Sequence, residues 1–309
     1  MIYTVTLNPA LDKTVEIPSF AVDSVNRIVS LRTDPGGKGI NVSKVIARLG
    51  STSRAIGILG GTTGQAIAQA LAEENMVCDF LPVEGDTRIN LKVIDPVTHT
   101  STEINEPGAA VDEATLQSLL DHLVKMLRRD DIVVLAGSLP QGAPKDTYRV
   151  WGEACREKGA KVFLDSDGDA MREGMAAVPY LLKPNNDELS RLMGRELDSL
   201  EELIAAAREL LRQGTAKVVV SMGSRGMLYV TPERTLYAPG LKVPVKSTVG
   251  AGDAVVAALA VAEEQGLPLE ETVRLSAAAG TASVMCSGTQ AAEREVVDGL
   301  VPQVTFREI

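Results

Sequence analysis

A turn of small residues near the end of the chain leads to a single carboxylate. Gly250, Ala251, Gly252 and Asp253 come directly before an apolar run that predicts a helix. Two glycines let the backbone approach a ligand, and the free N–H groups and positive dipole end of a helix start attract an anion. Asp253 could be a plain N-cap, which the turn alone favours, or a base that takes a proton from a hydroxyl.

A second glycine-rich turn contains a cation. Lys38 lies among three glycines, Gly36, Gly37 and Gly39, and Asn41 follows in a pattern that predicts another helix. Exposed backbone N–H groups beside an ammonium group suit a sugar phosphate or a carboxylate. The alternative is a flexible loop with a solvated lysine.

Other polar residues follow predicted strands, at the edge where open α/β sheets bind ligands. Asp12 ends the first strand, although a simple turn aspartate is the alternative. Lys183 could hold a phosphate, and Asn185 and Glu188 supply oxygen atoms that could hold Mg²⁺ through water or form a capping box. Ser138 lies in a further turn at a strand end, a weak signal by itself.

Ser221, Gly223 and Gly226 form a turn after another strand, and this turn could admit a nucleotide. Two familiar phosphate-binding motifs are absent. A dinucleotide fingerprint needs Gly or Ala where Val255 stands. A P-loop needs a glycine at the position that Arg32 occupies before the Gly-Lys pair.

These residues need a scaffold that brings strand ends and helix starts together. Short apolar, β-branched runs alternate with helical patterns, and the almost wholly apolar runs suit strands covered on both faces. Strand–helix–strand repetition predicts an α/β fold with a doubly wound, mainly parallel sheet and helices on both faces. The predicted strands of this core comprise residues 2–7, 55–59, 132–136, 161–165, 180–183 and 217–221.

Two stretches of the chain do not follow this alternation of strands and helices. Residues 13–34 and 86–106 read as alternating strands without helices between them. Four short strands make a sheet with too little core of its own, so we expect a lid that covers a ligand or a second subunit. The chain has no internal repeat and no low-complexity linker. We therefore expect residues 1–309 to form one domain, with the lid as an excursion from it.

The composition excludes several classes of function. The 309 residues include 31 Lys and Arg against 41 Asp and Glu, a net charge of −10, which argues against nucleic-acid binding and against an anionic membrane surface. No apolar run approaches the roughly 18 residues of a membrane span, and no secretory signal is expected. Three scattered cysteines and two isolated histidines predict a reducing cytoplasm and no zinc site.

Five motifs occur in one order along the chain, and together they resemble the PfkB (ribokinase-like) carbohydrate kinases. Each motif is modest alone, but five in order over essentially the whole chain are highly specific. Within the family the chain resembles the 1-phosphofructokinase and tagatose-6-phosphate kinase branch. The motifs are Asn8-Pro9-Ala10-x-Asp12, Gly36-Gly37-Lys38-Gly39-x-Asn41, Gly137-Ser138-Leu139-Pro140, Lys183-Pro184-Asn185-x-x-Glu188-Leu189 and Gly250-Ala251-Gly252-Asp253.

The resemblance implies a doubly wound core, a β-sheet lid shared across a homodimer, and ATP-dependent phosphorylation of a sugar-phosphate hydroxyl. Asp253 would be the base, and the amides of residues 250–253 would form the anion hole for the transferred phosphoryl group. Lys38 would hold the phosphate already on the substrate, with help from Arg88 of the lid. The implied substrate site comprises Asp12, Gly37, Lys38, Asn41, Arg88 and Ser138.

The resemblance also implies where ATP and Mg²⁺ bind. Lys183, Asn185 and Glu188 would serve the ATP phosphates and Mg²⁺. Arg27 corresponds to a lid position that can reach the nucleotide of the neighbouring subunit. The residues that would line the nucleotide are Ser221, Gly223, Gly226, Ser247, Val249 and Gly288.

The substrate follows from the same resemblance. Lys38 favours a phosphorylated sugar over a free one, and residues 87–92 look like those of 1-phosphofructokinases, which make fructose 1,6-bisphosphate from fructose 1-phosphate and ATP. A tagatose-6-phosphate kinase or a fructose-6-phosphate kinase of the family is the alternative. From other classes, a sugar-phosphate sensor without turnover and a nicotinamide oxidoreductase are the competing hypotheses, and the failed glycine fingerprint counts against the second.

Overall fold

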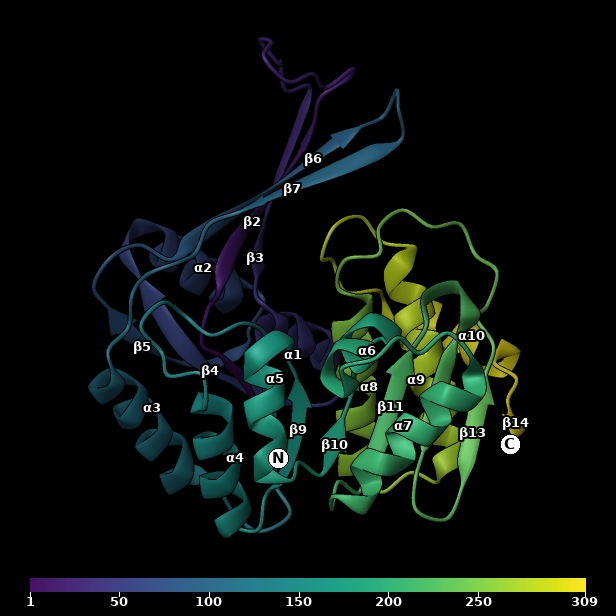
Figure 1. Ribbon diagram of the computed structural model, residues 1–309. Coiled ribbons are helices and arrows are strands. Elements are labelled where there is room, and N and C mark those ends of the chain that lie inside the picture. Colours follow the sequence, from purple (N-terminus) through teal and green to yellow (C-terminus); the bar gives the residue numbers. More distant parts are fainter.

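The computed structural model describes residues 1–309, and its main element is a ten-stranded sheet (Figure 1). The strand order is β14-β13-β12-β11-β10-β9-β8-β1-β4-β5. Strands from β11 to β5 pair in parallel, and β12 to β14 extend that edge in antiparallel pairs. The strands are β1 (Ile2–Thr6), β4 (Ser53–Gly60), β5 (Val77–Val83), β8 (Ile132–Ala136), β9 (Lys161–Asp165), β10 (Leu181–Leu182), β11 (Lys217–Ser221), β12 (Met227–Val230), β13 (Thr235–Ala238) and β14 (Arg307–Glu308).

Helices cover both faces of this sheet, because successive strand residues point to opposite sides. In β8, Val134 packs with α1, α8, α9 and α10, whereas Val133 and Leu135 pack with α3, α4 and α7. No helix is long and apolar enough to cross a bilayer. The helices are α1 (Lys38–Arg48), α2 (Gly61–Glu73), α3 (Glu113–Met126), α4 (Thr147–Glu157), α5 (Gly168–Gly174), α6 (Asn186–Met193), α7 (Leu200–Arg212), α8 (Ala251–Glu264), α9 (Leu269–Val284) and α10 (Arg294–Leu300), with short 3-10 turns at Met175–Ala177, Gly223–Arg225 and Val301–Gln303.

The predicted α/β fold is confirmed. The strands expected at residues 132–136, 161–165 and 217–221 have those bounds in the structure. The strand expected at 180–183 is shorter, since only Leu181 and Leu182 pair with β9 and β11.

A separate four-stranded sheet, the lid, projects from the body (Figure 1). Asp12 lies inside its strand β2, opposite Asn90 and Asp34, and not at the end of β1 as expected. The chain bends after Thr6 and pairs with the lid from Ala10 onward, so the strand begins earlier than residue 13. The lid order is β3-β2-β6-β7, with β2 (Ala10–Glu16), β3 (Ser30–Gly36), β6 (Arg88–Asp95) and β7 (Thr100–Asn105).

The lid has a very small interior of its own. Its buried apolar cluster consists of Val15, Ile17 and Val93. Large apolar side chains are instead exposed on its strands and loops, for example Val22 at 89%. Such a sheet needs another surface for stability. The exposed apolar residues of the lid are Val22, Val25, Ile28, Val29, Leu31, Val97 and Ile104.

Candidate active site

A cavity of about 700 Å³ lies where the lid faces the carboxyl ends of the central strands and the start of α8. It brings the two glycine-rich turns together, although they are more than 200 residues apart in sequence. The residues expected from the sequence that line it are Asp12, Gly37, Lys38, Asn41, Arg88, Lys183, Asn185, Glu188, Ser221, Gly223, Gly226, Val249, Gly250, Ala251, Gly252, Asp253 and Gly288.

Three expected residues do not line the cavity. Ser247 is buried, and its hydroxyl oxygen accepts a hydrogen bond of 3.2 Å from the Val249 N–H, so it shapes the turn before α8. The Ser138 hydroxyl oxygen accepts a bond of 3.3 Å from the Asn8 amide. Arg27 is exposed in the lid loop between β2 and β3. Roles for these three in binding stay predictions.

Helix α8 begins with an uncapped N-terminus. Gly250 is its N-cap, with a φ of 82° that an L side chain rarely adopts, and no side chain caps this end. The N–H groups of the first turn are therefore available to an anion, and the helix dipole adds positive potential. Asp253 lies within that first turn, so the interpretation of Asp253 as a plain N-cap is wrong.

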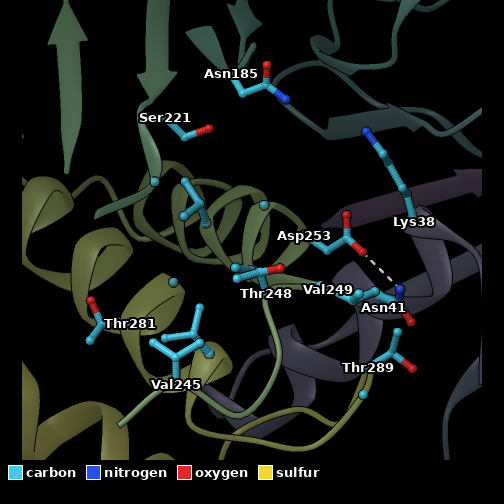
Figure 2. Close-up of a pocket in the computed structure, with 18 of the residues that line it drawn as sticks. Lys38, Asn41, Asn185, Ser221, Val245, Thr248, Val249, Asp253, Thr281 and Thr289 are labelled. Carbon is cyan, nitrogen blue, oxygen red and sulfur yellow. Dashed lines mark hydrogen bonds between the residues drawn. The ribbon is translucent and has the colours of Figure 1, made fainter. Parts of the chain in front are cut away.

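Asp253 is a buried carboxylate held by one side chain from the other glycine-rich turn. Its Oδ2 accepts a hydrogen bond of 2.8 Å from the Asn41 amide, and Figure 2 shows the two side chains meeting from different elements. Burial raises the pKa of Asp253 to about 6, against the opposing effect of Lys38. A carboxylate that titrates near neutral pH suits a general base.

The raised pKa of Asp253 predicts an acid limb in the pH profile. Only the deprotonated carboxylate can accept a proton, so we expect kcat/KM to level off above this pKa of about 6 and to fall below it, by roughly tenfold per pH unit. Initial rates between pH 5 and pH 8 measure this. The phosphate of the substrate ionises in the same pH range. The pH dependence of the sugar-phosphate Kd, measured with the Asp253→Asn variant, is therefore the control. A flat profile after this correction would contradict a base at Asp253.

Two lysines share a second buried carboxylate beside Asp253. The Nζ atoms of Lys38 and Lys183 each lie 3.3 Å from Oδ1 of Asp165, which is 1% exposed. Burial alone would raise the pKa of Asp165, but both lysines outweigh it and the pKa is lowered. Burial alone would lower the pKa of Lys38, yet Asp165, Asp253 and Glu188 raise it. The site therefore keeps cations beside the Asp253 carboxylate, an arrangement that suits the transfer of a highly charged group.

The glycines around Lys38 are explained by close packing of α1 against β1. Gly37 is the N-cap of α1, with a φ of 112°. A Cβ on Gly39 would lie 2.6 Å from the backbone oxygen of Val5, which is too close for any side chain. Lys38 is the first residue of α1, and its side chain extends toward the side of the pocket where Asn185 lies (Figure 2).

Asn185 and Glu188 form a capping box at the start of α6. The Asn185 Oδ1 accepts from the Glu188 N–H and the Glu188 Oε2 accepts from the Asn185 N–H, both at 2.8 Å. Both residues also line the cavity. No three His, Cys, Asp or Glu side chains cluster as a metal cage. One carboxylate beside a phosphate site nevertheless fits Mg²⁺, which is commonly bound through few protein ligands, waters and nucleotide phosphates.

The lid side of the cavity carries polar atoms without partners. Asp12 accepts a hydrogen bond of 3.0 Å from the Asn90 amide, and burial raises the pKa of Asp12. The side-chain oxygens of Asn41 and Asn90 and the Nε of Arg88 are buried without a hydrogen-bond partner. Buried polar groups are rarely left unpaired, so these atoms indicate a polar ligand with several hydroxyl groups.

Two residues of the site were not expected from the sequence. Asn90 is one of several polar residues in an alternating strand pattern, and nothing in the pattern distinguishes it. Its role is indicated by the pairing register of β2 and β6, which places it opposite Asp12. Asp165 ends β9, a strand that was predicted with its correct bounds. Its position at a strand end was the only sequence signal that it could belong to the site. Its lysine partners come from α1 and from the end of β10, and spacing alone does not relate them.

A doubly wound fold, an uncapped helix start and a buried carboxylate beside paired lysines suit phosphoryl transfer, which depends on positioning and on charge stabilisation. The family model of the "pfkB family carbohydrate kinase" matches residues 5–295. The chain therefore belongs to the PfkB family of carbohydrate kinases, as its motifs predicted. Family membership removes the nicotinamide oxidoreductase hypothesis.

Individual relatives are similar over nearly their whole length. The 1-phosphofructokinase of Bacillus subtilis is 40% identical over 98% of both chains. The D-tagatose-1-phosphate kinase of Bacillus licheniformis is 36% identical over 93% of this chain and 94% of that protein. The crystal structure of phosphofructokinase-2 from Escherichia coli with substrates and products has a TM-score of 0.93, at 34% identity and 98% coverage of both chains.

Proposed function

We propose that this kinase is an ATP-dependent 1-phosphofructokinase that phosphorylates fructose 1-phosphate on its C6 hydroxyl. The observation that carries the proposal is the buried carboxylate of Asp253, next to an uncapped helix start and opposite a lid lined with unpaired polar atoms. Several relatives at 34–41% identity are named 1-phosphofructokinase. Their names support the choice of substrate.

In the proposed reaction Asp253 accepts the proton of the C6 hydroxyl while that oxygen forms a bond to the γ-phosphorus of ATP. The bond from this phosphorus to the β–γ bridging oxygen breaks, and ADP leaves. The N–H groups of residues 250–253 hold the transferred phosphoryl oxygens. Mg²⁺ held through Asn185 and Glu188 would neutralise phosphate charge when bound.

Lys38 and Lys183 stabilise the charge that is transferred. Lys38 pairs with Asp165, and its pKa is raised in part by Asp253. These neighbours favour a role at the transferred phosphoryl group over the role that the resemblance implied, which was to hold the phosphate already on the sugar. Arg88 then holds that phosphate from the first position of β6, and Asp12, Asn41 and Asn90 hold sugar hydroxyls.

The remaining assignments belong to the same proposal. Exposed apolar residues on the lid support a homodimer formed by two lids, and Arg27 would then reach the partner's nucleotide. The use of ATP and a phosphorylated ketose supports a cytoplasmic location for the reaction. The nucleotide would lie along residues 221–226 and 247–249 and the loop with Gly288, toward the Thr281 side of Figure 2.

ADP release with Mg-ATP tests the proposed function. The acceptors are fructose 1-phosphate, tagatose 1-phosphate, tagatose 6-phosphate, fructose 6-phosphate, fructose and ribose. We expect the highest kcat/KM with fructose 1-phosphate. Equal turnover of free fructose would contradict a sugar-phosphate site, and no turnover of any acceptor would favour a sensor.

Tagatose 1-phosphate is the second candidate, because a relative at 36% identity is named for it. The two sugars differ only in the configuration at C4. A higher kcat/KM for tagatose 1-phosphate would replace fructose 1-phosphate as the substrate and leave the site chemistry as described.

A further inference from the structure

One hydrogen bond joins the lid to the far side of the cavity. Arg32 of β3 donates from Nη2 to the backbone oxygen of Ser287, 2.6 Å away, in the loop after α9. Its Nε also donates to Asp34 at 2.7 Å. Because the guanidinium is planar, two bonded nitrogens fix its orientation. The bond links residues that are 255 positions apart.

The same loop packs directly beneath the lid at Gly288. Arg32 and Thr14 are cross-strand partners in β3 and β2. A Cβ on Gly288 would lie 3.1 Å from Cζ of Arg32 and 3.6 Å from the hydroxyl oxygen of Thr14, and the φ of Gly288 is +62°. The positive φ favours glycine at this position, and a side chain here would displace the guanidinium of Arg32 from the loop.

The loop continues from this contact to the head of α8. Thr289 is buried and lines the cavity, and a Cβ on Gly250 would lie 3.8 Å from its Cα. On the lid, Asp12 lies two residues before Thr14, so both side chains are on one face of β2. Arg32 and the loop of residues 287–289 thus lie between the face of β2 that carries Asp12 and the anion site at Gly250.

We infer that Arg32 is a positioning residue that couples sugar-phosphate binding at the lid to nucleotide binding at the loop of residues 287–289. The inference rests on the proposed function, because it takes the lid as the sugar side and this loop as the nucleotide side. A sugar phosphate that fixes the lid also fixes the loop, and the nucleotide then binds a loop that is already in place. By linkage, the nucleotide tightens sugar-phosphate binding by the same factor.

Calorimetry of the full-length protein tests the coupling. The Kd of a non-hydrolysable Mg-ATP analogue is measured with and without the phosphorylated ketose that the enzyme turns over. In the wild type we expect the sugar phosphate to tighten nucleotide binding by about 5-fold or more. In Arg32→Gln we expect this factor to fall to near one, with the nucleotide Kd in the absence of sugar unchanged. Arg32→Lys should restore part of the factor, since lysine can reach only one of the two acceptors at a time.

Arg294→Gln is the matched control. Arg294 has the same bonding pattern, with Nε on Asp298 and Nη1 on the backbone oxygen of Leu49, but it joins α10 to the end of α1 and has no contact with the lid. It should keep the wild-type coupling. Asp34→Asn, which replaces the charged acceptor of the Arg32 Nε with a neutral amide oxygen, is the second variant if Arg32→Gln does not fold, and it should lower the factor.

Two outcomes overturn the inference. One is a wild-type coupling factor of one, and the other is an unchanged factor in Arg32→Gln or, if that protein does not fold, in Asp34→Asn. Failure of the proposed function is distinct from both, because it appears as absent or differently selective ADP release by the wild type.

Discussion

Asp253→Asn is expected to lower kcat on the order of 10³-fold while the protein still binds Mg-ATP and sugar phosphate. The amide keeps the size of the side chain but cannot take a proton. Its buried position and raised pKa, to about 6, make the carboxylate a base poised near neutral pH. The N–H groups at the start of α8 remain, so binding of the phosphates should change little.

Steady-state kinetics and calorimetric binding measure these two effects separately. Asp112→Asn is the matched control, because Asp112 caps α3 far from the cavity and asparagine caps a helix equally well. It should keep wild-type kcat. A near-normal kcat for Asp253→Asn would remove Asp253 as the base, and lost binding of both ligands would assign it a structural role instead.

Lys38→Met is expected to lower kcat by about 10²- to 10³-fold, the loss typical of removing one group that stabilises transition-state charge. The reason is its position, since its ammonium group lies 3.3 Å from Asp165 and interacts with Asp253. The KM for the sugar phosphate should change by a much smaller factor. Steady-state kinetics with fructose 1-phosphate and with free fructose provide kcat and KM for each acceptor.

The relative sizes of the changes in kcat and in the KM for the sugar phosphate distinguish the two possible roles of Lys38. If Lys38 held the phosphate already on the sugar, its loss would raise the KM for fructose 1-phosphate and leave turnover of free fructose unchanged. That pattern would contradict the role proposed here. Lys145→Met is the matched control, because Lys145 forms a 2.6 Å ion pair with Asp169 on the exposed surface and should not affect either constant.

The sequence was sufficient for the core of the fold, because its strands are apolar runs buried on both faces. β8 and β11 are such runs, and their predicted bounds are confirmed. β10 was predicted too long, since backbone pairing and not hydropathy decides where it ends. Ser199 and Glu202, three residues apart, form a capping box at the start of α7, which shows that such a short-range spacing is reliable here.

The site was only partly predictable, because glycine turns are local signals and side-chain partners are not. The turns at Gly37 and Gly250 identified both halves of the cavity. The ion pairs of Asp165 and the pairing of Asn90 with Asp12 depend on strand order and register. Neither spacing nor composition contains that information, so these contacts required the three-dimensional structure.

The small interior of the lid has a consequence for amide hydrogen exchange. Only Val15, Ile17 and Val93 shield the lid strands from within, whereas β1 and β8 lie between two large cores. Lid amides should therefore exchange through local opening, at a free energy far below that of global unfolding. A molecule that bridges the lid and the body adds its binding free energy to the closed form. The protection of the lid amides against hydrogen exchange therefore depends on which ligands are bound, and it reports directly on occupancy of the site.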